Sequence, residues 1–224
     1  MNTIRKSFII TSAAILLILL AGGCARKWSE EKLESHTLIH NKGGLTLGYS
    51  PSSGVKIIAA DRFAFKDLNR NGKLDVYEDW RLPFDDRARD LASQMTVEQI
   101  AGLMLYSSHQ SIPAAGRAPA GGGTYGGKPY AESGAGAGDL SDQQKIFLSD
   151  DNVRHVLITS VQSPEAAAVW NNNAQSFVEG IAFGIPVNTS SDPRHGSDPH
   201  AEYNAGAGGN ISLWPGTLGI AATF

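Results

Sequence analysis

The 224-residue sequence contains a single cysteine, Cys24, so no disulfide bond can form within the chain. Basic residues are also in short supply, because 19 Lys and Arg stand against 22 Asp and Glu and give a formal net charge of −3. Proteins that bind nucleic acids need clustered Lys and Arg to neutralise phosphates. The composition therefore argues against a nucleic-acid partner.

The chain also lacks an apolar run of the roughly 20 residues that a membrane-spanning helix needs. Its longest apolar segment, Ile9 to Leu20, follows Arg5 and Lys6 and precedes small residues, an order typical of export signals. Cys24 comes directly after those small residues. We expect residues 1–23 to be a lipoprotein signal peptide and Cys24 to be acylated, which would anchor the protein to a membrane of a bacterial cell envelope. A plain secretory signal, with a secreted product, is the alternative.

Residues 24–82 are polar and mixed, and we expect a tether and a small N-terminal extension. Turn signals surround two short β-like runs, 45–47 and 55–58, which predict a small hairpin. After Pro83 the pattern becomes helical over 85–92 and 97–104, and Thr96 is a natural N-cap for the second helix. The glycine-rich run 107–139 shows no apolar period, which indicates a functional loop, an insertion or disorder.

Order returns with a short helix predicted over 142–148. Residues 153–160 read as a strand buried on both faces, and Ser163 then starts a helix whose apolar stripe continues to Ile181. Residues 185–190 give the next strand. Two strands joined by a helix through short links pair in parallel. The sequence thus predicts an α/β fold, although periodicity alone does not separate a barrel from an open sheet.

The second of these strands ends in Asp192-Pro193-Arg194-His195-Gly196, and a Trp-Pro-Gly-Thr-Leu-Gly-Ile-Ala-Ala-Thr run begins at Trp214. With the helix pair that follows Arg81, these segments resemble the N-terminal barrel domain of family 3 glycoside hydrolases, the β-glucosidase-like enzymes. The resemblance implies that residues 83–224 are the opening portion of a (β/α)8 TIM-type barrel, a fold that takes about 250 residues.

The resemblance also implies that Asp192 binds the sugar of a β-glucoside or oligosaccharide substrate, since a carboxylate offers two acceptors to vicinal hydroxyls. Arg194, His195 and Gly196 would then support the loop. The alternative is that Asp192 only initiates a turn with Pro193. Further acidic and imidazole side chains follow in this loop, namely Asp198, His200 and Glu202. A metal site is therefore an alternative interpretation of the loop. The residues match no helical zinc motif, however, and the family's catalysis requires no cofactor.

Retaining glycosidases use two carboxyl groups, one as nucleophile and one as acid/base. The residues that hold these roles in the family have no counterpart up to Phe224, so we expect no catalytic residue in this chain. We interpret the sequence as a fragment of an exo-acting β-glucosidase, inactive by itself. Two other classes stay open, namely a non-catalytic surface glycan-binding lipoprotein and a calcium-dependent scaffold module.

Residues 67–78 fill the ligand positions of the EF-hand-like calcium loop of twelve residues. Glycine stands at place 6 as Gly72, Lys73 offers its backbone carbonyl at place 7, and side-chain oxygens come from Asp67, Asn69, Asn71, Asp75 and Glu78. The preceding residues 61–66 are too short and aromatic for a helix. We expect a structural calcium ion that anchors the N-terminal extension, with a metal-free Asx-turn loop as the alternative. A calcium sensor is disfavoured because sensing needs a helix pair that opens.

Overall fold

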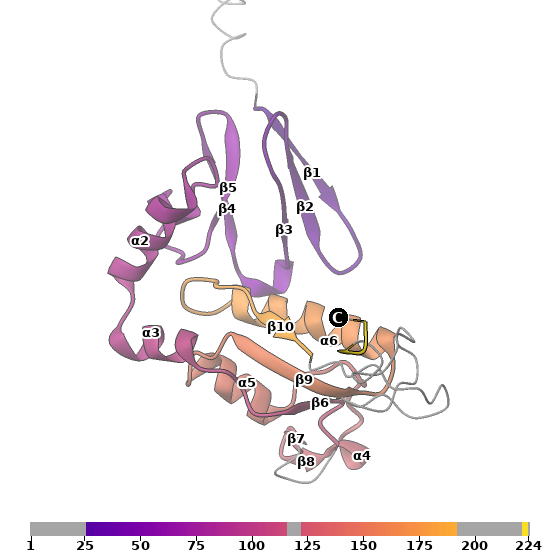
Figure 1. Cartoon of the computed structure of the whole chain (residues 1–224). Coiled ribbons are helices and arrows are strands. Elements are labelled where there is room, and N and C mark those ends of the chain that lie inside the picture. The colour runs from indigo at the N-terminus through magenta and orange to yellow at the C-terminus, as the bar shows by residue number, and fades with distance from the viewer. Residues whose placement is uncertain (1–25, 116–121, 192–220, 224) are drawn as a thin grey trace, which may run out of the picture.

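The computed structural model describes residues 26–115, 122–191 and 221–223 of the chain. Figure 1 shows two layers, with antiparallel strands of the N-terminal half above and parallel strands with their helices below. The upper layer consists of β1 (Trp28–Lys32), β2 (Thr37–Asn41), β3 (Thr46–Tyr49), β4 (Lys56–Ala60) and β5 (Phe63–Asp67), with a 3-10 turn η1 (Pro51–Ser53) between β3 and β4. A second 3-10 turn, η2 (Val76–Glu78), leads to α2 (Phe84–Gln94) and α3 (Val97–Met104).

The upper strands form two antiparallel sheets, β1-β2-β3 and β4-β5. The hairpin predicted between 45–47 and 55–58 is therefore wrong, because β3 pairs with β2 and β4 pairs with β5. Most of the expected tether is a regular three-stranded sheet. The buried Asn41 side chain joins the two sheets, since it donates to the Ala64 carbonyl at 3.1 Å and accepts from the Ala64 amide at 2.8 Å.

Aromatic packing closes the upper layer. The Trp80 ring stacks on Phe65, with the ring centroids 5.4 Å apart, and meets Phe63 edge-on. Its indole nitrogen donates to the Ala64 carbonyl at 3.0 Å, so the half-buried ring packs on the hairpin without leaving its polar atom unpaired. Residues just before the first helix are thereby fixed on the β4-β5 hairpin.

The lower layer is built on three parallel strands in the order β10-β9-β6. Its elements are β6 (Gln110–Ile112), β7 (Thr124–Tyr125), β8 (Lys128–Pro129), α4 (Tyr130–Ser133), α5 (Asp142–Ser149), β9 (His155–Val161), α6 (Pro164–Glu179) and β10 (Asn188–Ser190). The predicted helix, strand, helix and strand after Ser141 are thus confirmed with shifts of a few residues at their ends. The fold is mixed α and β, and the described residues form no closed barrel.

The core lies between the parallel strands and helices α5 and α6. Trp170, Ala174 and Val178 of α6 are fully buried together with Leu148 of α5 and Val156 of β9. A buried polar chain crosses this core, since Trp170 donates to Gln144 at 3.0 Å and Gln144 donates to Gln110 at 3.3 Å. Each buried polar atom in that chain has a partner, which avoids the cost of an unpaired group.

Two predictions for this layer need correction. The run 107–139 was expected to be a functional loop, an insertion or disorder without regular elements, but it contains β6, the short β7-β8 pair and α4. β6 carries only one large apolar residue, Ile112, so its sequence has no apolar period that predicts a strand. The segment is a strand because it pairs with β9. β9 was expected to be buried on both faces, yet only Val156 is fully buried and its neighbours are half-buried.

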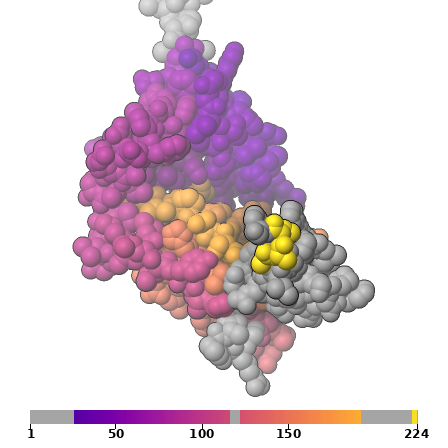
Figure 2. All heavy atoms as spheres, in the orientation of Figure 1, coloured from indigo at the N-terminus to yellow at the C-terminus, as the bar shows by residue number. Residues whose placement is uncertain are grey.

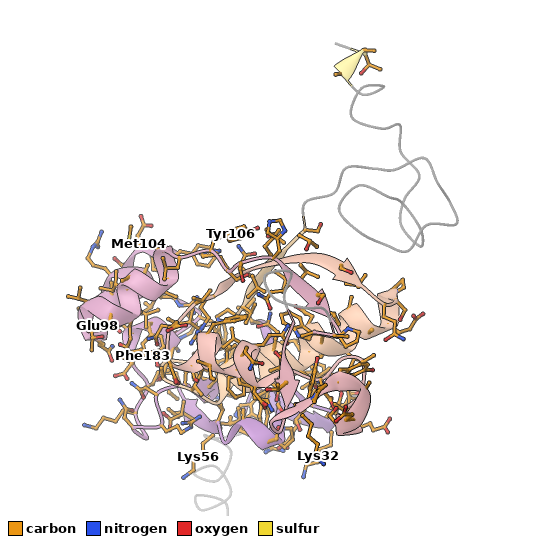
Figure 3. The ribbon with its side chains drawn as sticks, turned by 90° about the horizontal axis from the view of Figure 1, so that it is seen from below. Lys32, Lys56, Glu98, Met104, Tyr106 and Phe183 are labelled. Carbon is orange, nitrogen blue, oxygen red and sulfur yellow. The ribbon has the colours of Figure 1, made fainter. Side chains whose placement is uncertain are left out.

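Helices α2 and α3 form the flank at the left of Figures 1 and 2. The N-cap predicted at Thr96 is confirmed, with the backbone amide of Gln99 donating to the Thr96 hydroxyl at 3.2 Å, and the Gln99 side chain completes a capping box. The apolar stripe of α3 points outward, however, and Val97 and Met104 are 78% and 82% exposed. Met104 lies at the rim of the molecule in Figure 3. In the described part of the chain, no helix is long and apolar enough to cross a membrane.

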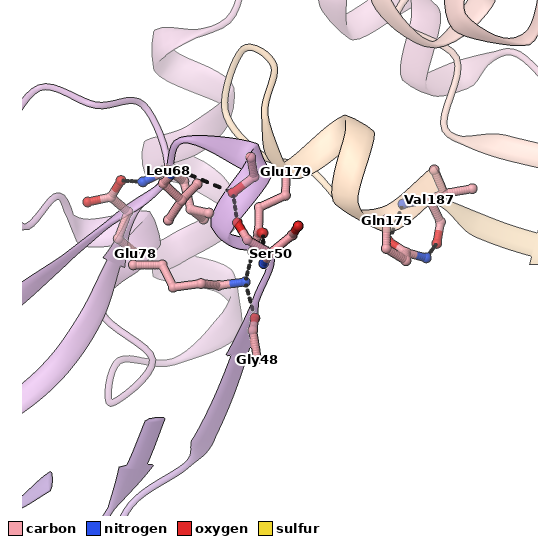
Figure 4. Close-up of polar contacts among 10 residues, drawn as sticks. Gly48, Ser50, Leu68, Glu78, Gln175, Glu179 and Val187 are labelled. Atoms are coloured by element: carbon pink, nitrogen blue, oxygen red, sulfur yellow. Dashed lines mark hydrogen bonds and ion pairs between the residues drawn. The ribbon is translucent and has the colours of Figure 1, made fainter. Parts of the chain in front are cut away.

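Glu179, in the last turn of α6, connects the two layers (Figure 4). Its carboxylate accepts from the Ser50 amide at 2.8 Å and pairs with the Lys66 ammonium at 2.7 Å. Lys66 also donates to the Gly48 carbonyl at 3.1 Å. Both charged side chains are largely buried, so the pair is screened less than a surface ion pair.

We expect Glu179→Gln to lower the free energy of unfolding by about 1 to 2 kcal/mol, because Lys66 loses its charged partner in a buried position. Chemical denaturation followed by circular dichroism measures the change. Glu34→Gln removes an exposed carboxylate between β1 and β2 and should stay within about 0.5 kcal/mol of the parent protein. Equal stability of the two variants would show that the contact contributes little to joining the layers.

Candidate functional site

The carboxyl ends of the parallel strands define the first candidate site, because ligands of α/β proteins bind at that edge. The backbone amide of Gln162 donates to the Ile112 carbonyl at 2.7 Å, and this bond holds the ends of β9 and β6 together. Helix α6 starts directly beyond β9, where the Ser163 hydroxyl accepts from the Ala166 amide at 3.1 Å. The amino end of α6 therefore faces the same edge.

Side chains from α6 fix the course of the chain through β10 to this edge. The side-chain amide of Gln175 donates to the Val187 carbonyl at 2.8 Å, and its oxygen accepts from the backbone amide of Val187 at 3.1 Å, as Figure 4 shows. The Thr189 hydroxyl donates to Asn171 at 3.4 Å. Tyr106, which precedes β6, reaches across β9 to bond the Ser190 hydroxyl. β10 is thus held on both sides.

Asp192 follows Ser190 by two residues, so the candidate sugar ligand comes directly after a strand that is aimed at the expected edge. Asp192 itself, Arg194, His195 and Gly196 lie outside the described residues, as do the acids and imidazoles of the alternative metal site. Cys24 also lies outside them. The structure therefore describes the approach to this site and not the predicted ligands.

The first turn of α6 offers one carboxylate near this edge, Glu165. Its own backbone N–H and then the Ser163 hydroxyl lower the pKa of Glu165, so it is an ionised, exposed helix-capping group. A general acid needs a raised pKa and a buried position. Glu165 therefore suits the stabilisation of α6 and does not have the character of a glycosidase acid.

A cavity of about 670 Å³ opens elsewhere, along α6 between η1 and α4. Ser52, Asn173 and Ser176 contribute to its lining, and the carboxyl ends of β6, β9 and β10 contribute no described residue to it. The cavity is open and lacks an arrangement of two facing carboxylates. We do not assign it a catalytic role.

The second candidate site is the loop of residues 67–78, which connects β5 to η2. A strand enters the loop where an EF-hand has a helix, in keeping with the aromatic character of residues 61–66. Gly72 adopts φ +75°, the left-handed conformation that place 6 of the loop requires. Its amide donates to Asp67 Oδ2 at 3.1 Å, so the loop turns around the Asp67 carboxylate.

Glu78 closes the loop from the other end. One carboxylate oxygen accepts from the backbone amides of Leu68 at 2.7 Å and of Asn69 at 3.3 Å. The other oxygen accepts from the backbone amide of Asp75 at 3.1 Å. Burial raises the pKa of Glu78 against these backbone bonds, which lower it. Burial also raises the pKa of the neighbouring Tyr77 well above its usual range.

The middle of the loop is held by side-chain amides. Asp75 Oδ2 accepts from Asn69 at 2.6 Å and from Asn71 at 2.7 Å. Within the described residues, no three His, Cys, Asp or Glu side chains form a cluster able to hold a metal by themselves. Any cation at this loop would need amide and backbone oxygens as well, as the twelve-residue pattern requires.

A buried charged group beside β9 also escaped the sequence analysis. Arg154, just before β9, donates to the carbonyls of Leu148 at 2.6 Å, Val153 at 2.9 Å and Ile185 at 2.9 Å. Burial lowers the pKa of its guanidinium. Arg154 lies at the amino end of β9, opposite the ligand edge, so its role is to hold the chain ends that lead into the parallel strands. Its basic character within an apolar run was the only available signal.

Comparison with known proteins links the chain to β-glucosidases. It is 37% identical over 170 residues to a periplasmic β-glucosidase/β-xylosidase of Dickeya chrysanthemi, which covers 75% of this chain and 23% of that protein. It is 27% identical over 157 residues to a probable β-glucosidase C of Aspergillus oryzae, covering 68% and 21% of the two chains. A β-glucosidase C of Emericella nidulans is 26% identical over 160 residues, covering 70% and 22%.

No protein-family model matches the chain. The chain spans less than a quarter of the length of the three relatives. The matches nevertheless confirm the resemblance that the sequence motifs indicated, because over about 70 to 75% of its length the chain is similar to β-glucosidases, the enzymes typical of glycoside hydrolase family 3.

Proposed function

We propose that this chain is part of an exo-acting glycoside hydrolase that removes terminal β-D-glycosyl residues by a retaining double displacement. The observation that carries the proposal is the 37% identity over 170 residues to a protein named as a β-glucosidase/β-xylosidase. Relatives from two fungi also carry the name β-glucosidase C, so a glycoside is the substrate class that the comparisons favour.

The fold supports a role in the opening part of a (β/α)8 barrel. The β6, β9 and β10 strands are parallel, and α5 and α6 precede and follow β9 along the chain, as repeated strand–helix units require. The outward apolar stripe of α3 and the half-buried face of β9 are surfaces that further strands and helices of a barrel would cover. We infer that the nucleophile and the acid/base belong to such further elements.

Within this proposal Asp192 binds the sugar at the non-reducing end. Its place after β10 is supported by the contacts that hold this strand from α6 and from Tyr106. A carboxylate there accepts hydrogen bonds from two adjacent hydroxyls, and bonds to a charged acceptor are the stronger class. Arg194 and His195 would hold the loop, and Gly196 would allow its turn.

We also propose an envelope location. The relative from Dickeya chrysanthemi is named as periplasmic, and residues 1–23 have the order of charged, apolar and small residues that export signals share. Cys24 would carry the lipid that holds the protein at a membrane.

The chain alone should not hydrolyse an aryl β-glucoside, because a retaining mechanism needs two carboxyl groups about 5 to 5.5 Å apart and we assign neither of them to this chain. A continuous assay of the purified chain, beside a full-length family member as the positive control, measures this. Turnover by the chain, lost on substitution of Asp192, Asp198 or Glu202, would contradict the assignment.

In the longer protein that we propose, Asp192→Ala should lower kcat/KM by about two to four orders of magnitude. Each lost bond to a charged acceptor costs about 1.5 to 3 kcal/mol, and each 1.36 kcal/mol corresponds to a factor of about ten. Steady-state kinetics on an aryl β-glucoside measures the effect, with circular dichroism to establish that the variant is folded. Glu132→Ala, which removes an exposed carboxylate in α4, is a control. Activity of Asp192→Ala within threefold of the parent would assign Asp192 to the turn alone.

Metabolic labelling with a radioactive fatty acid tests the lipid anchor. We expect the parent protein to be labelled in a bacterial host and the Cys24→Ser variant to be unlabelled, because Cys24 is the only cysteine and the only candidate for acylation after signal cleavage. Equal labelling of the two proteins, or none in the parent, would leave a plain secretory signal as the explanation of residues 1–23.

A further inference from the structure

We propose that the loop of residues 67–78 binds a calcium ion and that this ion fastens the N-terminal sheets to helix α6. The proposal concerns a metal site and does not depend on glycoside hydrolysis. Its starting point is one atom of Asp67, the residue at the first ligand place. Asp67 is 2% exposed, and its Oδ1 is buried without any hydrogen-bond partner.

A buried carboxylate oxygen without a partner is costly, because the group has left water and gained no donor in exchange. The other oxygen of Asp67 accepts from the Gly72 amide, so the carboxylate is turned into the loop. None of the ion pairs among the described residues involves Asp67, Asp75 or Glu78. Three acids thus share one small loop without a cationic partner, and a bound divalent cation would compensate them.

The remaining donors are oxygens of the kinds that calcium prefers. Asn69 and Asn71 present their side-chain oxygens to the amides of Asn71 and Lys73, at 3.1 Å and 2.7 Å, and each oxygen keeps a second lone pair. Asp75 and Glu78 contribute carboxylates at the ninth and twelfth places. The set contains no sulfur or imidazole, which excludes the ligand types typical of zinc and favours a hard cation.

Calcium binding would replace hydrogen bonds that now occupy carboxylate oxygens of the loop. The amide groups of Asn69 and Asn71 donate to Asp75, and backbone amides occupy both oxygens of Glu78. With these bonds in place, the three acids do not form a cluster able to hold a metal by themselves. We therefore expect binding to draw Asp75 and Glu78 toward the buried oxygen of Asp67.

The position of the loop indicates what the ion does. Arg70 donates to the carbonyls of Ser53 and Gly180, and thus connects the loop to η1 and to the end of α6. Leu68 lies so near Gly184 that a Cβ there would come within 2.8 Å of its side chain. Tyr77 packs edge-on against Phe183, with the ring centroids 6.0 Å apart. A rigid loop would hold the segment after α6 as well as the end of β5.

The binding step is tested with calcium chloride alone on the full chain, after treatment with a chelator. Isothermal titration calorimetry gives the dissociation constant, and thermal unfolding gives the coupling to the fold. At calcium concentrations about a hundredfold above the dissociation constant, we expect the melting temperature to rise by about 5 to 10 °C. Magnesium at the same concentration should give a smaller rise, because it demands six ligands at shorter distances.

Two substitutions locate the site. Asp67→Asn should abolish the calcium-dependent rise in melting temperature. Because Asp67 is buried and its substitution can impair folding, Asn71→Ala provides an independent test at an exposed position of the loop. We expect Asn71→Ala to weaken calcium binding by about tenfold or more, since one ligand place is lost. Glu132→Gln removes an exposed carboxylate in α4 and so matches the charge change of Asp67→Asn. This control variant should bind calcium like the parent.

The proposal is overturned if the folded parent chain shows neither binding heat nor a change in melting temperature at millimolar calcium. It is also overturned if Asn71→Ala binds calcium as tightly as Glu132→Gln, because the ion would then lie elsewhere. Loss of glycosidase activity plays no part in either outcome. A failure of the glycosidase proposal and a failure of the calcium proposal are therefore distinguishable.

Discussion

The burial of one apolar stripe of α6 against the parallel strands is the constraint on which the described structure depends. Trp170, Ala174 and Val178 fill the core from this helix, and Gln144 satisfies the only polar atom of the Trp170 side chain. The last turn of the same helix carries Glu179, which binds Ser50 and Lys66 of the upper layer. One helix thus organises the parallel sheet and also holds the N-terminal sheets against it.

The same helix sets the course of the chain toward the candidate sugar site. Gln175 binds both backbone groups of Val187, and Asn171 accepts from Thr189, so β10 runs beside β9 in a fixed register. A ligand residue placed after β10 therefore inherits its position from packing in the core. Substitutions in α6 at a distance from the candidate site would therefore change the position of the residues after β10 through these contacts.

The loop of residues 67–78 and the Glu179 contact lie on the same boundary between the two layers. Lys66, which pairs with Glu179, directly precedes Asp67, and Arg70 reaches the carbonyl of Gly180 just after Glu179. A cation in the loop and the ion pair beside it would stabilise one junction by two means. The N-terminal extension then acts as a brace for α6, and through α6 for the parallel strands.

Much of this arrangement was accessible from the amino-acid sequence. Helices α3, α5 and α6 were predicted because capping residues and apolar periods are local signals, and the twelve-residue loop was recognised because its ligand places follow one another along the chain. The family resemblance, including Asp192 as a sugar ligand, also came from contiguous motifs. β1, β2 and β6 were missed because their order comes from pairing with distant or polar segments, which leaves no period in the sequence.

The sequence by itself determined the residue types at the loop, the capping of the helices and the kinship with β-glucosidases, because each is written in residues close together in the chain. Only the tertiary structure decided that Glu179 joins Ser50 and Lys66, that the stripe of α3 faces outward, and that Asp67 keeps a buried oxygen without a donor. These features depend on burial and on contacts between distant segments. Charge and hydrogen bonding acquire their energetic weight only where folding removes water from the group.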